Sequence, residues 1–497
     1  MSAPLITLTI EEVAAGLKAG EFTSVEITQA YLNRIAELNP KLNVYVNVST
    51  ELALAQAKAS DERRAAGKSL GVFDGVPYNL KDVYATTDSP TTASSRMLDG
   101  WVAPYNATVY HKLKSAGAVL LGKTNTDEFT MGVSTETSWQ GVTRNPWDLE
   151  RVSGGSSGGP AASIAAQLAT FSIGTDTGGS VRQPSSFCGV TGMKPTYGRV
   201  SRWGELPMAS SLDQTGPVTR TAKDAALVFE LLAGRDELDA TTLDDKVPSV
   251  DGMIPPAGDK PLAGMKVGVA EEYFGDGVQP GVEKLIREAI AQVERLGATV
   301  TKVSLPAVPH ALAAYYIIAP AEVSSNMARY DGIRFGHSVE RENSGEKASL
   351  YDIYAKSRAE GIGTEVQRRI MLGTHVLSAG HYDAYYRKAE EVRQVVATQF
   401  AEAFSEVDVL LAPVSPNTAF KIGEQVNDPV AMYKEDVLAV PANIGGIPGI
   451  SVPCGFSNGL PVGLQILAGR LNEAALFKTA IAYQAATDFH KQYPEVA

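Results

Sequence analysis

Apolar residues recur every three or four positions in the N-terminal part of the chain, a pattern typical of helices with one buried face. The clearest run spans 27–38. Two Thr-x-x-Glu pairs, at 9–12 and 23–26, have the spacing of capping boxes and predict where two helices begin. Asn39-Pro40 predicts the end of the second helix, because proline cannot donate a backbone hydrogen bond.

Short apolar strand patterns alternate with amphipathic helix patterns along the rest of the chain. This alternation is typical of an α/β domain with a predominantly parallel or mixed sheet. At 446–469 two apolar runs flank a Ser-Asn-Gly turn, which predicts a hairpin. The other predicted strands are 43–48, 76–80, 118–125, 266–270, 298–303 and 407–413, and the predicted helices are one ending at about Gly67, 108–117, 222–233, 280–296, several within 308–405 and one closing at about Phe489.

The length of the chain and two of its stretches bear on domain organisation. The 497 residues alone favour about three domains, although large α/β enzymes can keep a single sheet. Residues 1–67 are expected to form a helical lead into the sheet. Residues 235–262 are polar and proline-rich, and they predict an exposed linker or insertion at the surface.

Charge limits the partners of the chain. It has 44 Lys and Arg against 56 Asp and Glu, which gives a net charge of −12, and no basic run stands out. A broad nucleic-acid footprint needs a clustered basic face, so direct RNA binding is not expected to be its main task. Any nucleic acid is expected to be held by a partner.

Cysteine usage and the N-terminal residues indicate the compartment. Cys188 and Cys454 lie far apart and lack metal-ligand spacing, so neither a disulfide framework nor a zinc site is indicated. The N-terminus lacks the basic and apolar regions of a secretory signal, and no stretch approaches the roughly 18 apolar residues of a membrane-spanning helix. We therefore expect a cytoplasmic protein without a membrane span.

The stretch from Ser153 to Pro184 holds two glycine-flanked serines. Ser156 lies in GGSSGG and Ser180 ends GTDTGGS, and an alanine-rich helix pattern and a short strand pattern join them. Glycine loses much conformational entropy on folding and packs no side chain, so this clustering indicates loops shaped for close approach by another group. Two ordinary surface turns remain the alternative.

Three other serine or glycine-loop chemistries fit less well. GGSSG matches the G-x-S-x-G motif of α/β-hydrolases, but the charged, proline-containing RNPWDLERV before it does not predict the required buried strand. No histidine lies between 112 and 309, so a histidine-based triad would need a distant residue and stays a minor alternative. A phosphate-binding loop would need a Lys-Ser/Thr ending that GGSSGGP lacks.

A lysine base is the remaining possibility. Lys81 follows the apolar segment VPYNL, where a strand end would deliver it to the edge of the sheet. Burial lowers the pKa of a lysine toward the range of a neutral proton acceptor, and such a lysine can activate a neighbouring serine. The alternative is a solvated lysine paired with Asp82.

The ordered set GVPYNLKD, GGSSGG, GTDTGGSVRQP, FCGVTGMKP and ASSLDQTGP resembles the amidase signature family. The resemblance implies one large α/β domain over 1–497, with a mixed β-sheet covered by helices on both faces. It also implies a Ser-Ser-Lys triad of Lys81, Ser156 and Ser180, in which Ser180 is the nucleophile and Ser156 relays its proton to neutral Lys81. No metal or cofactor in this chain is implied.

The same resemblance explains the glycines of both loops. It implies a cis peptide between Gly155 and Ser156, and an oxyanion hole in which the N–H groups of Thr177, Gly178 and Gly179 act together with that of Ser180. Asp176 and Arg182, within GTDTGGSVRQP, are expected to form a structural charge pair that supports the loop.

Within the family, segments outside these motifs are similar to the A subunits of tRNA-dependent amidotransferases. The similarity covers nearly the whole chain and implies a free-glutamine pocket at Tyr315, Arg369 and Asp436. An arginine suits the α-carboxylate and an aspartate suits the α-ammonium of glutamine. Arg368 is the alternative to Arg369, and TNTDEFTMG at 124–132 is expected to form another wall of the pocket.

The implied function is that of a glutaminase in a heterotrimeric ligase of protein biosynthesis. Ammonia would pass to a B subunit, which binds tRNA and uses ATP and Mg to amidate Glu-tRNA(Gln) alone or also Asp-tRNA(Asn), while a small C subunit wraps the pair. A stand-alone amidase acting on small amides is the alternative enzyme. A non-enzymatic assembly scaffold is the alternative outside catalysis, and the complete triad argues against it.

Overall fold

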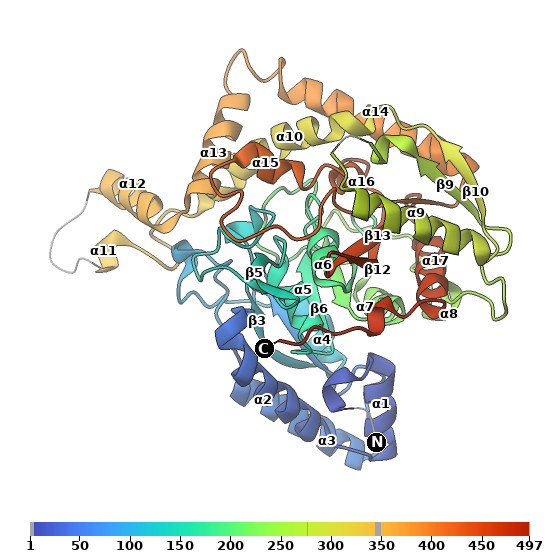
Figure 1. The fold of residues 1–497 in the computed structure, drawn as a ribbon. Coiled ribbons are helices and arrows are strands. Elements are labelled where there is room, and N and C mark those ends of the chain that lie inside the picture. The colour runs from blue at the N-terminus through green and yellow to red at the C-terminus, as the bar shows by residue number, and fades with distance from the viewer. Residues whose placement is uncertain (1–3, 276, 343–348, 497) are drawn as a thin grey trace.

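The computed structural model describes residues 4–275, 277–342 and 349–496. Its centre is a mixed sheet wrapped by helices (Figure 1). Within the described residues this sheet has eleven strands in the order β1-β3-β2-β6-β8-β7-β12-β13-β11-β9-β10, and β4 and β5 form a separate two-stranded ribbon. The fold predicted for the family, one α/β domain around a mixed sheet, is confirmed.

Strands and helices alternate through most of the chain, as the hydrophobic pattern predicts. The strands are β1 Tyr45–Val48, β2 Pro77–Lys81, β3 Val119–Thr124, β4 Arg144–Asn145, β5 Asp148–Val152, β6 Phe171–Thr175, β7 Thr191–Lys194, β8 Thr215–Thr219, β9 Lys266–Ala270, β10 Thr299–Val303, β11 Val409–Pro413, β12 Gly449–Ser457 and β13 Leu460–Ala468. The helices are α1 Ile10–Ala19, α2 Ser24–Leu42, α3 Thr50–Ala65, α4 Thr108–Ser115, α5 Gly158–Ala165, α6 Arg182–Cys188, α7 Ala222–Leu232, α8 Val250–Met253, α9 Pro280–Arg295, α10 Ala311–Asn326, α11 Val339–Glu342, α12 Leu350–Gly361, α13 Thr364–Val376, α14 Tyr386–Glu406, α15 Pro429–Lys434, α16 Val440–Ile444 and α17 Glu473–Ala485.

Both predicted capping boxes are present at the starts of α1 and α2. The predicted end of α2 at Asn39-Pro40 is wrong, because the helix continues through Pro40 to Leu42. Proline costs little there, since only the last turn follows it and Asn43 closes the helix in a left-handed conformation with its N–H donating to Asn39. Burial of Leu42 stabilises the extra turn.

The C-terminal hairpin is confirmed, whereas two helix predictions need correction. β12 and β13 pair antiparallel across Asn458 and Gly459, both of which have positive φ as a tight hairpin turn requires. The last long helix, α17, ends at Ala485 rather than at about Phe489. Helix α6, which starts directly after the second glycine loop, was not predicted by the sequence pattern.

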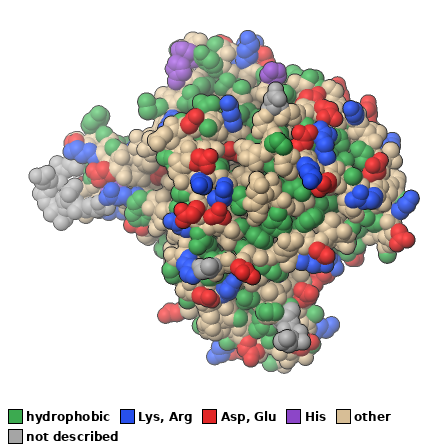
Figure 2. Space-filling model, viewed as in Figure 1, with side chains coloured by type: hydrophobic (Ala, Val, Ile, Leu, Met, Phe, Trp, Pro, Cys, Tyr) green, Lys and Arg blue, Asp and Glu red, His purple; other side chains and the backbone are tan. Residues whose placement is uncertain are grey.

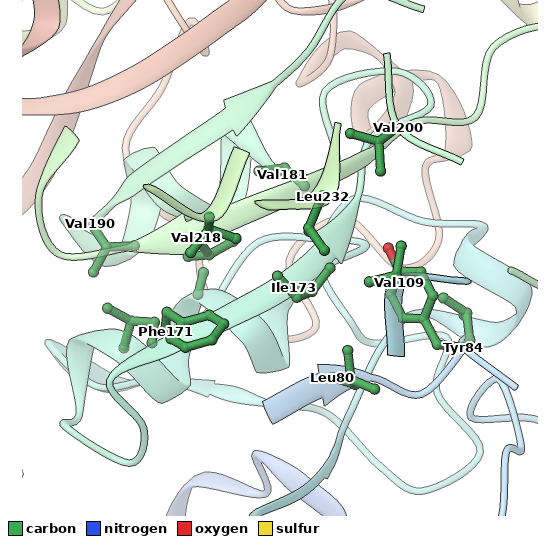
Figure 3. Close-up of a cluster of buried hydrophobic side chains, with 14 of the residues drawn as sticks. Leu80, Tyr84, Val109, Phe171, Ile173, Val181, Val190, Val200, Val218 and Leu232 are labelled. Carbon is green, nitrogen blue, oxygen red and sulfur yellow. The ribbon is translucent and has the colours of Figure 1, made fainter. Parts of the chain in front are cut away.

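Each face of the sheet buries its own layer of side chains. In β11, Leu410 packs in the cluster that includes β2, β3 and β6, while Leu411 packs in the cluster formed with α7, α9 and α17. Successive side chains of a strand point to opposite faces, so both faces are covered by helices. Figure 3 shows the first cluster, with Leu80, Ile173 and Val218 from neighbouring strands.

The stretch 235–262 runs over the surface and contains only the short helix α8. Met253 and Leu262 from this stretch are buried in the cluster around α7, α9 and α17. The segment is thus anchored to the domain at two points.

The topology brings two strand ends to one edge of the sheet. β2 and β6 pair in parallel, with Tyr78 opposite Phe171, so their carboxyl ends lie together. Lys81 is the last residue of β2. Thr175 is the last residue of β6, and the rest of the GTDTGGS segment follows it as a loop. Open α/β sheets bind ligands at such carboxyl ends.

Candidate active site

Lys81 is fully buried and surrounded by hydroxyl groups. Its Nζ donates to Ser156 Oγ at 2.8 Å, to Ser157 Oγ at 2.9 Å and to Thr175 Oγ1 at 2.7 Å. Burial lowers the pKa of Lys81 to about 7, although nearby carboxylates, Asp127 foremost, act in the opposite sense. A lysine in this setting is available as a neutral proton acceptor near neutral pH.

The alternative of a solvated lysine paired with Asp82 is wrong. Asp82 is itself buried, accepts hydrogen bonds from the backbone and side chain of Thr92, and lies 4.0 Å from the ammonium of Lys123. The two neighbouring residues of the motif therefore face different partners, as adjacent positions near a strand end do.

The GGSSGG loop lies directly against the second serine loop. The peptide between Gly155 and Ser156 is cis, as predicted. The Ser157 N–H donates to the carbonyl oxygen of Ser180 at 3.0 Å, and Ser156 and Ser180 are both buried. The strand before this loop, β5, belongs to the small ribbon with β4 and not to the main sheet, which agrees with rejecting an α/β-hydrolase turn.

A buried carboxylate organises the loop around Ser180. Asp176 accepts from the Gly179 N–H at 2.9 Å and from the Arg182 side chain at two nitrogens, each 3.0 Å away, and Asn443 donates to it at 2.8 Å. Burial alone would raise the pKa of Asp176, but Arg182 holds it well below its ordinary value. The expected structural pair of Asp176 and Arg182 is therefore present.

Within the free chain, one of the predicted oxyanion donors already has a partner. The Gly179 N–H is already engaged by Asp176. Among the described residues, the N–H groups of Thr177, Gly178 and Ser180 have no hydrogen-bond partner. These three backbone donors remain available to a bound group, and the glycines of the loop also serve close packing.

Gly178 packs tightly against Tyr315, and Gly179 packs tightly against Ala439 in the segment that carries Asp436. A Cβ atom on Gly178 would lie 2.7 Å from Cζ of Tyr315, and one on Gly179, whose φ is +128°, would lie 2.6 Å from Cβ of Ala439 and 3.5 Å from Oδ1 of Asp436. Any side chain at these two positions would displace the pocket wall.

The three predicted pocket residues come from separate elements. Tyr315 lies on α10, Arg369 on α13, and Asp436 follows α15; the side chains are 3%, 3% and 4% exposed. Burial raises the pKa of Asp436 well above its ordinary value, and Arg369 opposes this shift. Oδ1 of Asp436 has no hydrogen-bond partner in the described part of the chain, so a buried acceptor awaits a donor.

The structure separates the two adjacent arginines. The side chain of Arg368 is 42% exposed, whereas that of Arg369 is 3% exposed and near enough to Asp436 to act against the rise in its pKa. Residues 124–132 pack against the other serine loop: a Cβ atom on Gly155 would lie 2.1 Å from Oδ2 of Asp127.

Two residues in contact with the lysine were not predicted. Ser157 and Thr175 each place a hydroxyl oxygen within 2.9 Å of Lys81 Nζ. Ser157 is the second serine of GGSSGG, and Thr175 ends a strand beside Lys81, so only the parallel pairing of β2 and β6 would have identified it.

The chain is similar to known proteins in sequence and in fold. A model of the amidase family matches residues 26–477. The chain is 50% identical over 486 residues to the A subunit of the glutamyl-tRNA(Gln) amidotransferase from Methylococcus capsulatus, covering 98% of each protein. It is 40% identical to the crystal structure of the corresponding A subunit from Thermotoga maritima, with a TM-score of 0.82 over 100% of this chain and 99% of that one.

A second solved structure is also similar. The peptide amidase from Stenotrophomonas maltophilia is 30% identical to this chain, with a TM-score of 0.82 over 99% of each chain. The resemblance to amidase signature enzymes is confirmed, and the chain belongs to the amidase family.

Proposed function

We propose that this chain is the glutaminase subunit of a glutamyl-tRNA(Gln) amidotransferase. The names of relatives at 50% identity over almost their full length support this assignment. The single observation that carries it is the contact between the two predicted sites: Tyr315 packs tightly against Gly178, and Oδ1 of Asp436 would lie 3.5 Å from a Cβ atom on Gly179, within the loop that ends in Ser180.

The proposed chemistry uses three side chains. Ser180 Oγ attacks the carboxamide carbon of glutamine while its proton passes through Ser156 Oγ to the neutral amine of Lys81. The N–H groups of Thr177, Gly178 and Ser180 stabilise the oxyanion that forms.

The relay then runs in reverse to complete the turnover. It returns the proton to the leaving nitrogen, ammonia departs, and a γ-glutamyl ester remains on Ser180. Water, deprotonated through the same relay, cleaves the ester and releases glutamate.

Selection of glutamine requires recognition of its α-carbon groups. Arg369 would bind the α-carboxylate, Asp436 the α-ammonium, and Tyr315 would line the wall between them and the nucleophile loop. The side-chain hydrogen bond of Arg369 within the described chain uses Nε alone, so its two terminal nitrogens remain for a bidentate carboxylate contact. The ammonium of glutamine would supply the donor that Asp436 lacks.

The later steps belong to partner subunits in this proposal. A B subunit would bind tRNA and use ATP and Mg to activate Glu-tRNA(Gln), or also Asp-tRNA(Asn), and a C subunit would complete the heterotrimer in the cytoplasm. Figure 2 shows acidic and basic side chains interspersed over the face in view, without a basic patch. No described helix is long and apolar enough to cross a membrane.

A stand-alone amidase is the second candidate, because the fold matches the peptide amidase as closely as it matches the Thermotoga maritima protein. The amidotransferase needs charged groups that recognise free glutamine, whereas an amidase acting on small amides does not. The buried, unpaired Oδ1 of Asp436 favours the amidotransferase.

The test is coexpression with candidate B and C subunits, followed by glutamine-dependent amidation of both misacylated tRNAs. We expect the complex to use glutamine, and its Ser180→Ala variant to use only added ammonium. A Ser180→Ala complex that still uses glutamine, or a chain that assembles with no partner and hydrolyses small amides instead, would refute the proposal.

A further inference from the structure

Arg369 is held in place by groups that do not belong to the predicted pocket. Its Nε donates to Oε1 of Glu365 at 2.8 Å, one helical turn earlier on α13. Its guanidinium carbon also lies 5.4 Å from the ring centre of Tyr316 and 5.4 Å from that of Tyr433. The two rings stack on each other with centres 4.0 Å apart. Cation–π attraction at this range orients the guanidinium.

The same oxygen of Glu365 connects two elements that are distant in sequence. The hydroxyl of Tyr433 on α15 donates to Glu365 Oε1 at 2.8 Å, across 68 residues. Tyr433 in turn accepts the backbone N–H of Asp436 at its carbonyl. Glu365 therefore joins the helix that carries Arg369 to the turn that carries Asp436.

This connection matters because Arg369 and Asp436 attract each other. Both are buried, and Asp436 has an oxygen without a partner among the described residues. Without a second anion to hold it, the arginine would move toward Asp436 and close the space that an α-amino acid needs. Glu365 supplies that anion on the arginine side.

We propose that Glu365 and Tyr433 are positioning residues that keep Arg369 and Asp436 apart, and that this bridge sets the chain length of the α-amino acid amide the site accepts. The bridge fixes where the α-carbon groups of the substrate sit relative to Ser180. This position determines how many methylene groups the substrate can have between its α-carbon and its carboxamide. This inference rests on the proposed function, because it assumes that the site takes glutamine.

The chain offers a matched pair of variants for the test. Tyr433→Phe removes the hydroxyl that donates to Glu365, whereas Tyr316→Phe removes the hydroxyl of the stacked ring, which is buried and has no partner among the described residues. Both changes keep a ring at the same distance from Arg369. Their comparison isolates the bridge from the stacking.

Both variants would be assayed in the assembled complex by ammonia release from glutamine, from asparagine and from butyramide, which lacks the α-carbon charges. We expect Tyr433→Phe to raise KM for glutamine about tenfold with little change in kcat. The ratio of kcat/KM for glutamine to kcat/KM for asparagine should fall. Hydrolysis of butyramide should change by the same small factor in both variants. Glu365→Gln should repeat the selective rise in KM and serves as the second variant if Tyr433→Phe does not fold.

Equal effects of Tyr433→Phe and Tyr316→Phe, or a loss that is equal for glutamine and butyramide, would overturn the inference. A wild-type complex that hydrolyses butyramide but not glutamine would instead overturn the proposed function, so the two failures are distinguishable.

Discussion

The amine nitrogen of Lys81 lies 2.8 Å from the hydroxyl oxygen of Ser156, with both side chains fully buried. Solvation normally keeps a lysine charged, and its loss here lowers the pKa of Lys81 to about 7. The serine loops are placed around a base whose protonation state changes near neutral pH.

The first prediction concerns pH. Lys81 accepts the proton only when neutral, so kcat/KM for glutamine should fall about tenfold per pH unit below about 7 and level off above it. Lys81→Arg, which stays charged at every accessible pH, should lose activity by about 10³-fold or more across the range. A profile that stays flat from acidic to neutral pH would contradict a lysine base.

The second prediction separates the two serines beside Lys81. Ser156→Ala removes the proposed relay and should lower kcat by about 10³-fold or more, with little change in KM. Ser157 also donates to the carbonyl oxygen of Thr175 at 3.0 Å, which gives it a supporting role, and Ser157→Ala should lower kcat by about tenfold at most. Single-turnover kinetics of both variants would check this, and a larger effect at Ser157 would exchange the two roles.

The third prediction tests the close approach at Gly178. An added Cβ would lie 2.7 Å from the Tyr315 ring and would push the loop or the ring aside. Gly178→Ala should lower kcat/KM for glutamine by about 100-fold while the thermal unfolding midpoint changes little. Near-wild-type activity would mean that glutamine hydrolysis does not depend on the position of the Tyr315 ring against this loop.

The fourth prediction compares the adjacent arginines. Arg369→Ala removes a buried guanidinium and should raise KM for glutamine about 100-fold, yet spare amidation driven by added ammonium in the complex. Arg368→Ala should change KM by about threefold at most, because that side chain is 42% exposed and pairs with Oε2 of Glu365 rather than with the oxygen that holds Arg369. Loss of amidation with both glutamine and ammonium would indicate misfolding. A larger rise in KM for Arg368→Ala than for Arg369→Ala would make Arg368 the residue that binds the α-carboxylate.

Local patterns predicted the parts of the site that depend on neighbouring residues. The motif around Lys81 and the two glycine loops are contiguous in sequence, and the capping boxes and the Asn458-Gly459 turn are short-range as well. The family resemblance added the roles, which spacing alone left open.

Interactions between distant segments could not be predicted in this way. Asn443 donates to the Asp176 carboxylate that engages the Gly179 N–H, and it comes from 267 residues away. The hydrogen bond from Tyr433 to Glu365 joins two helices that only the fold brings together. The helical spacing of Glu365 and Arg369 was visible in the sequence, but such pairs usually lie on exposed surfaces.

In the proposed mechanism, Ser180 forms a γ-glutamyl ester from glutamine. The most direct measurement is mass spectrometry of the acid-quenched complex after brief exposure to glutamine, with peptide mapping of the modified residue. We expect a mass increase of one γ-glutamyl group on the peptide that contains Ser180, and none in the Ser180→Ala complex. An adduct on a different residue, or glutamine hydrolysis that persists in Ser180→Ala, would contradict the account.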